Sequence, residues 1–334
     1  MFGDSWSCAF LGAASAALFL FSGGIIMFSI LKAIKLNQSE LDQYYIQKRK
    51  QQFERTNGIP RHIHLHNLFH WLLLPCIKCL RIINKRKLYI CCDKRVKTNK
   101  PIIYAGTHIG GVDIETSFEA IRNPCWLFLG DPREVYKNFD GILLGLNGVI
   151  CLDSKDKNDR RIAKEAAIQL LKHKGNLLIY PEGAWNISEN LPVTELFLGT
   201  VEIAMESNAD IIPIAIEFYG NDLFVAIGKN IDLRNTSQNK FFINQLLRDN
   251  LATLKWEIWK HQGIKKRSAI PKNYHSEFVN SIINGNKETS NTVDDVLKTT
   301  FVNKNIIKYS DVFEHLNHIT PNINNAFLYN KRLK

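Results

Sequence analysis

Cysteine is sparse in this sequence, and its spacing excludes a domain built on disulfides. Seven cysteines in 334 residues, among them Cys76-x-x-Cys79 and Cys91-Cys92, do not reach the density of a disulfide framework. We therefore expect reduced thiols in a cytoplasmic compartment. No internal repeat is present either. With 45% hydrophobic residues, the chain is long enough to bury a substantial core.

Charge is missing from one long stretch near the N-terminus. Residues Cys8 to Leu31 carry no charged side chain and are mostly apolar, which is long enough to cross a bilayer as one helix. A cleaved signal peptide has a basic start, which this chain lacks. Only Asp4 precedes the stretch, and these basic residues follow it: Lys32, Lys35, Lys48, Arg49 and Lys50. By the positive-inside rule, residues 1–35 predict a retained single-pass anchor in the cell membrane, with the remainder of the chain in the cytoplasm.

Acidic residues are too few to balance the basic ones. Lys and Arg number 43 against 32 Asp and Glu, giving a net charge of +11 and indicating an anionic partner. Residues 36–95 begin with a polar stretch and continue with an apolar segment, Leu68 to Ile83, which basic residues close. We expect juxtamembrane and interfacial helices here, the second lying in the membrane surface. A re-entrant or core helix is the alternative.

From residue 96 short apolar runs alternate with helical stretches. The strand candidates are Ile102–Ala105, Trp126–Leu129, Val149–Leu152, Leu177–Tyr180 and Ile211–Phe218. Apolar stripes between 162 and 171 and between 197 and 205 predict helices that end near Gly175 and Asn208. This alternation predicts an α/β domain over residues 96–234, with a mostly parallel sheet flanked by helices. Residues 235–334 are expected to form a helical C-terminal extension.

The end of the first of these strands carries a histidine and an aspartate. In one continuous helix, five residues turn about 500°, so His108 and Asp113 would point about 140° apart. Gly110 and Gly111 allow a turn that brings the carboxylate back to the ring. We expect Asp113 to fix the tautomer of His108, whose other nitrogen faces a substrate as general base. A loop histidine beside a helix-capping aspartate is the alternative.

The fourth strand ends in Tyr180-Pro181-Glu182-Gly183, a turn with a carboxylate and an unhindered backbone. Glu182 is a candidate to hold a substrate hydroxyl or to brace the site. Gly183 is a candidate to offer its N–H to an oxyanion or a phosphate. An ordinary turn is the alternative.

Four short motifs occur in a fixed order. They are the HX4D motif His108-x4-Asp113, then Gly148-Val-Ile-Cys-Leu-Asp153, Tyr180-Pro-Glu-Gly183 and Ile212-Pro-Ile214. Over about residues 95–230, the chain resembles the phospholipid/glycerol acyltransferase family, which includes 1-acyl-sn-glycerol-3-phosphate acyltransferases. The resemblance implies a glycerolipid acyltransferase-like fold and a membrane-bound enzyme of phospholipid biosynthesis. It also implies direct attack of a lysophospholipid hydroxyl on an acyl thioester.

Carried over to this chain, the resemblance makes His108 the base, Asp113 its partner, and Glu182 and Gly183 contacts of the acceptor. The acyl donor is expected to be acyl-CoA or acyl carrier protein, with no cofactor, no metal and no nucleic acid. Two positions depart from the family, because Ser154 and Trp185 stand where arginines associated with the acceptor phosphate are usual. We expect Arg160 and Arg161 to substitute as a clamp, and Trp185 to floor the acceptor pocket or lie in the interface. The first candidate acceptor is 1-acylglycerol-3-phosphate, and another lysolipid or a glycolipid is the alternative.

Three other readings remain open from sequence alone. Cys125 or Cys151 could serve as a nucleophile with His108 as its base. A metal site could use alternating histidines together with the Cys76-x-x-Cys79 pair; the histidines are His62, His64, His66 and His70. A non-catalytic basic protein could bind membranes or RNA through its basic and aromatic residues at 241–267.

Overall fold

The computed structural model describes residues 36–130, 139–188, 191–233, 239–261, 272–285 and 292–301. The predicted membrane anchor, Cys8 to Leu31, lies outside these residues. In the ranges that are described, none of the helices is both long and apolar enough to span a bilayer.

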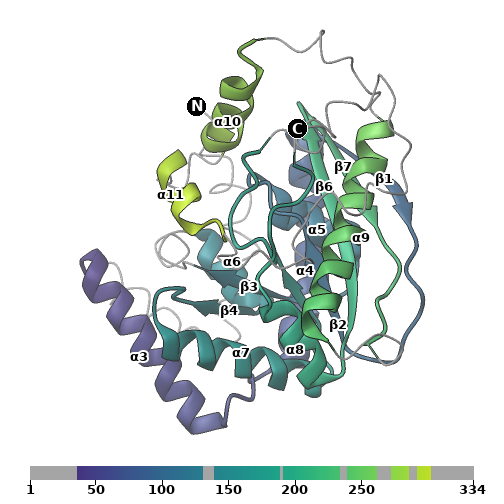
Figure 1. The fold of residues 1–334 in the computed structure, drawn as a ribbon. Helices are drawn as coiled ribbons and strands as arrows, with labels where there is room; N and C mark the ends of the chain where they lie inside the picture. Colours follow the sequence, from purple (N-terminus) through teal and green to yellow (C-terminus); the bar gives the residue numbers. More distant parts are fainter. Residues whose placement is uncertain are drawn as a thin grey trace.

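One seven-stranded sheet organises the described part of the chain (Figure 1). Its strands are β1 (Lys87–Asp93), β2 (Ile102–Gly106), β3 (Trp126–Gly130), β4 (Val149–Leu152), β5 (Leu177–Ile179), β6 (Asp210–Tyr219) and β7 (Asp222–Ile227). They lie in the order β1-β7-β6-β2-β5-β3-β4, and every neighbouring pair is parallel except β6 with β7. The predicted α/β class with a mostly parallel sheet is confirmed, as are the five strands expected from the apolar runs.

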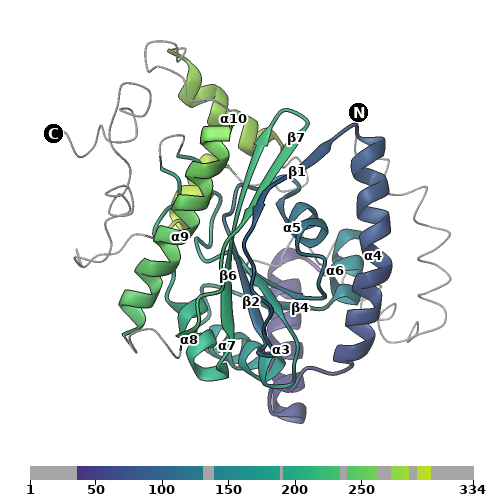
Figure 2. The same ribbon diagram turned by 90° about the vertical axis from the view of Figure 1, so that its right-hand side faces the viewer.

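Helices cover both faces of this sheet. Figure 2 shows α4 and α9 on opposite sides of it. The helices are α3 (Gln38–Thr56), α4 (Ile63–Ile83), α5 (Asp113–Ile121), α6 (Phe139–Asn147), α7 (Lys157–Lys172), α8 (Gly199–Ser207), α9 (Lys240–His261), α10 (Tyr274–Gly285) and α11 (Val293–Thr299). Buried residues of α4 and α5 share one apolar cluster, and those of α7, α8 and α9 share another on the opposite face.

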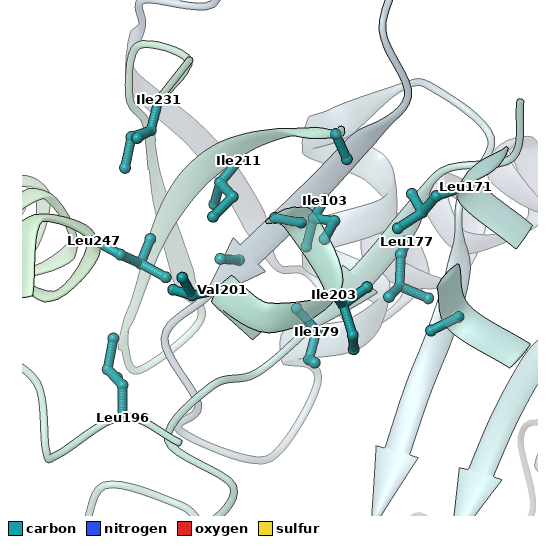
Figure 3. Packing of buried hydrophobic residues seen from close by; sticks show 14 of the residues in the cluster. Ile103, Leu171, Leu177, Ile179, Leu196, Val201, Ile203, Ile211, Ile231 and Leu247 are labelled. Carbon is teal, nitrogen blue, oxygen red and sulfur yellow. The ribbon is translucent and has the colours of Figure 1, made fainter. Parts of the chain in front are cut away.

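The alternation of side chains along β2 supplies both clusters. Ile103 packs into the cluster beneath α7, α8 and α9, whereas the next residue, Tyr104, packs into the cluster beneath α4 and α5. Figure 3 shows Ile103 near Ile211 of β6, within the cluster that also contains Val201 of α8. Because β2 is buried on both faces, its carboxyl end leaves the sheet from a rigid position.

Two strands were not predicted, and one of them corrects a predicted boundary. β1 lies inside residues 36–95, the range assigned to juxtamembrane and interfacial helices, yet it is an edge strand of the sheet. Residues 88–92 of this strand form an apolar run, but their side chains are half-buried or exposed, as expected of an edge strand. β7 follows β6 through a tight turn in which Gly220 has φ +62°, so the two form an antiparallel hairpin.

The polar stretch predicted to lie beside the membrane forms helix α3, which an ion pair holds against the domain. The Arg49 guanidinium donates to both carboxylate oxygens of Asp159 at 2.9 and 2.6 Å. Asp159 is fully buried in α7 and also accepts the backbone N–H of Asp153 at 2.6 Å. Asp153, the last residue of the second motif, is therefore linked through Asp159 to Arg49 of α3.

Candidate active site

The predicted turn after β2 is present. His108 lies two residues beyond Gly106, the last residue of β2, and Asp113 is the first residue of α5. Between them Gly110 and Gly111 have φ +78° and +65°, conformations that side-chain-bearing residues rarely adopt. The chain therefore reverses within five residues instead of continuing as a helix.

This reversal brings the histidine and the aspartate together. Nδ1 of His108 lies 2.8 Å from Oδ2 of Asp113, and the same oxygen accepts the N–H groups of Ile109 at 3.1 Å and Gly110 at 2.8 Å. Asp113 is 2% exposed, whereas the His108 side chain keeps 20% of its surface. Because a carboxylate only accepts hydrogen bonds, we assign the proton to Nδ1 and leave Nε2 as the basic nitrogen.

The backbone and the ring of His108 are held by the third motif. Its N–H donates to Oε1 of Glu182 at 3.0 Å, and its carbonyl accepts the N–H of Asn186 at 2.8 Å. The imidazole stacks on the Tyr180 ring at a centroid distance of 4.5 Å. Burial raises the pKa of Tyr180 well above its usual range, so the phenol stays neutral and bonds Ser117 Oγ at 3.0 Å. His108 is therefore fixed on several sides while one edge of its ring stays accessible.

Glu182 has the geometry of a brace. It is fully buried, and besides the His108 N–H it accepts the N–H and the hydroxyl of Thr194 at 2.8 and 2.7 Å. Of the two roles predicted for this carboxylate, the geometry favours bracing the site over holding a substrate hydroxyl. It joins the loop after β5 to the loop after β2.

The N–H of Gly183 is used within its own turn. Its N–H donates to the Tyr180 carbonyl at 3.0 Å, so the predicted donation to an oxyanion or a phosphate has no support in this geometry. Its φ is +70°, and an added Cβ would lie 2.5 Å from the Phe197 ring. The Phe197 ring in turn packs against the Phe301 ring, with 4.6 Å between their centroids. The described end of the C-terminal extension therefore reaches this turn.

Of the remaining residues predicted to contact the acceptor, Trp185 lies near His108, whereas the two arginines make contacts elsewhere. Trp185 is half-buried and lies edge-on to His108 at a centroid distance of 6.3 Å, where it can line a pocket. Arg160 and Arg161 are exposed on the first turns of α7, after the edge strand β4. Arg160 bonds the Ser154 carbonyl, while Arg161 bonds Asn158 at 3.0 Å and covers the Phe53 ring. These contacts do not bring either arginine to His108.

The cysteine and metal alternatives lose support. Cys125 is 1% exposed, and burial raises the pKa of its thiol, which opposes thiolate formation. The histidines are not on one face of an extended segment, since His64, His66 and His70 lie in helix α4. His66 Nδ1 is within 2.7 Å of the Leu146 carbonyl, and His70 Nδ1 is within 2.7 Å of Asn147 Oδ1.

Several residues of the site were not predicted from the sequence. In the sequence Tyr180 only begins a motif, because its stacking on His108 depends on β2 and β5 being neighbours. Thr194 and Asn186 lie in irregular chain after β5 and carry no sequence signal. Gly106 offered one signal: a Cβ there would lie 2.8 Å from the Tyr180 ring, so only glycine permits the ring stack.

Comparison with known proteins gives one family match to part of this chain. Residues 89–217 match the family described as Acyltransferase, a range that starts in β1 and ends in β6. This match covers less than half of the chain. No curated protein matches it. Among solved structures it is similar to the 1-acyl-sn-glycerophosphate acyltransferase PlsC from Thermotoga maritima, with 13% identity, a TM-score of 0.43, and coverage of 76% of this chain and 93% of that one. The acyltransferase match includes all of the geometry around His108, whereas α3, α4, α9, α10 and α11 lie outside it.

Proposed function

We propose that this acyltransferase transfers a fatty acyl group from an acyl thioester to the hydroxyl of a lysophospholipid, with His108 as general base. The single observation that carries the proposal is the 2.8 Å contact between His108 Nδ1 and the buried Asp113 carboxylate. Acyl-CoA or acyl carrier protein would be the donor, and the net charge of +11 suits the phosphates of either one. No cofactor is required by this chemistry.

The residues support the following steps. Nε2 of His108 removes the hydroxyl proton of the acceptor as its oxygen bonds to the thioester carbonyl carbon. Asp113 stabilises the imidazolium that forms and keeps the ring in place. The carbon–sulfur bond then breaks, and the imidazolium returns the proton to the departing thiolate. The products are an ester and a free thiol, and the enzyme regains its starting state without an acyl-enzyme intermediate.

The acceptor headgroup is the finer part of this proposal. 1-Acylglycerol-3-phosphate remains the first candidate. Its phosphate would have to extend from the His108 site to Arg160 and Arg161 on α7 for these to act as a clamp. Ser154 and Trp185 favour the second candidate, a lysolipid or glycolipid with a different headgroup, because an aromatic ring 6.3 Å from His108 suits a sugar or an apolar surface.

A panel assay tests the function. Membranes containing the full chain are incubated with labelled acyl-CoA or acyl carrier protein and with lysolipids that differ only in headgroup, and the products are identified. We expect one diacyl product above the background of membranes without the protein. If the acceptor is phosphorylated, Arg160→Ala and Arg161→Ala should each raise its KM by about tenfold. The neighbouring Lys164→Ala, on the same helix but paired with Glu202, should not. Absence of any acyl transfer across the panel would refute the function.

The exposed surface of helix α4 supports the proposal of membrane association. One face of α4 exposes large apolar side chains, which are Leu68, Trp71, Leu72, Ile82 and Ile83. Exposed Lys78, Lys85 and Lys87 lie on or just after the same helix. An apolar face bordered by cations is typical of a helix that lies in the plane of an anionic membrane surface. From this helix and the anchor predicted over residues 1–35, we propose that the enzyme lies on the cytoplasmic side of the cell membrane.

Tryptophan fluorescence can locate α4 in reconstituted full-length protein. We expect lipids with brominated chains to quench Trp71, which is 50% exposed on the apolar face. Trp71→Phe should therefore remove a large share of the quenchable emission. Trp259→Phe is the matched control, because the Trp259 indole on α9 donates to Glu217 of β6 at 3.1 Å and so faces the sheet. Equal quenching of the wild type and Trp71→Phe would contradict an interfacial α4.

A further inference from the structure

Helix α9 carries a lysine that is buried against the sheet. Lys255 is 2% exposed, and its Nζ lies 2.6 Å from Oε1 of Glu217 and 2.7 Å from the carbonyl oxygen of Ile216. Trp259, one turn further along α9, donates to the same Glu217 oxygen at 3.1 Å. α9 lies along β6 (Figures 1 and 2), and the family match ends at Glu217, so Lys255 lies outside it.

The carbonyl that Lys255 contacts lies where the sheet loses a strand. The β2–β6 ladder ends with Gly106 opposite Ile214. Beyond this point Thr107 replaces the strand, because its N–H donates to the Ile214 carbonyl at 2.9 Å and its Oγ1 accepts the Ile216 N–H at 3.0 Å. Lys255 donates to the Ile216 carbonyl, so side chains of two different elements hold the backbone groups of one residue.

The residue after Thr107 is His108. Thr107 is fully buried and its hydroxyl is tied to β6, so the position of this part of β6 sets where the peptide before His108 lies. A shift of one ångström in a reacting group can lower a rate about a hundredfold. A contact that fixes β6 here therefore acts on the imidazole without touching it.

We propose that Lys255 is a positioning residue of this enzyme: α9 uses its ammonium to fix β6 at Ile216, and Thr107 passes that position on to His108. Through α9, the C-terminal extension thus helps to position the active site. A structural ion pair alone would need only Glu217 as partner, and a buried pair of this kind is often replaceable by neutral groups at no loss of stability. The additional bond to the Ile216 carbonyl is the feature that links this pair to the end of β2. The inference rests on the proposed role of His108.

The test separates positioning from stability. Lys255→Met alone leaves Glu217 without its cation, so we pair it with Glu217→Gln, which keeps an oxygen for the Trp259 N–H. The double variant should melt within about 5 °C of the wild type. Its kcat for acyl transfer should fall at least ~10-fold, with KM for donor and acceptor within about twofold. Such a loss is expected for a misplaced base and not for a weakened substrate pocket.

Lys100→Met is the matched control. Lys100 is a largely buried lysine just before β2, and it pairs with Asp210 at 3.1 Å and Asp232 at 2.7 Å. Its loss should lower the melting temperature and leave kcat unchanged. A kcat within twofold of wild type in the double variant, or an equal loss in Lys100→Met, would overturn the proposal.

Thr107→Val tests the same link from its other end if the double variant does not fold. It removes the hydroxyl that accepts the Ile216 N–H, and unchanged kcat there would also overturn the proposal. His108→Ala measured in parallel keeps the two ideas apart. If His108→Ala is inactive and the Lys255 variants are normal, only the positioning role fails. If His108→Ala is active, the proposed chemistry fails.

Discussion

His108→Ala should abolish acyl transfer, with a loss in kcat of at least ~100-fold, while the protein stays folded. The alcohol of a lysophospholipid is a poor nucleophile until its proton is removed, and Nε2 of His108 is the nitrogen left to accept it once Nδ1 faces Asp113. The measurement is turnover of labelled acyl-CoA with the acceptor identified by the lysolipid panel, beside a thermal melt.

Asp113→Asn should be less damaging than His108→Ala, because it removes orientation and charge and keeps the base. The matched control is His173→Ala, at the exposed C-terminus of α7, which should retain wild-type kcat. Near-normal turnover in His108→Ala would rule out the assigned mechanism, whatever the effect of Asp113→Asn.

The sequence predicts the part of this site that is local in the chain. Two glycines with positive φ lie between His108 and Asp113, and glycine is the residue that allows such a reversal. The five predicted strands are apolar runs buried in the sheet, so their pattern reflects their burial directly. β1 and β7 also carry apolar runs, at 88–92 and 223–227. The first lies in a range assigned to membrane-surface helices and the second follows β6 after only two residues, so neither run was predicted as a strand.

Contacts between distant segments could not be predicted. The partners of the buried Glu182 carboxylate come from 74 residues earlier, at His108, and from 12 residues later, at Thr194. Lys255 meets Ile216 across 39 residues, and in the sequence it is one more cation on a helix rich in them. The pair His108 and Asp113 could therefore be predicted from the sequence, whereas the groups that hold it could be found only in the fold.

Glu182→Ala should be the most destabilising substitution in the site and should also lower kcat. The carboxylate is fully buried and accepts three hydrogen bonds, from the His108 N–H and from the N–H and hydroxyl of Thr194. Each buried donor left without a partner costs about 1–3 kcal/mol, so the free energy of unfolding should fall by about 3–9 kcal/mol. Denaturant unfolding, with turnover measured on the folded fraction, gives both quantities.

Glu182→Gln distinguishes a brace from an acceptor contact. An amide has one oxygen and one NH2 group, so either the His108 N–H or the Thr194 N–H would face a donor, and we expect a loss of about 1–3 kcal/mol in stability with reduced kcat. Thr194→Val keeps Glu182 and removes only the hydroxyl donor, so it should cost about 1 kcal/mol and leave KM unchanged. If Glu182 instead held the substrate hydroxyl, Glu182→Gln would raise the KM of the acceptor with little change in unfolding. That pattern would return this carboxylate to the acceptor pocket and leave His108 to be held in place by Tyr180 and Asn186.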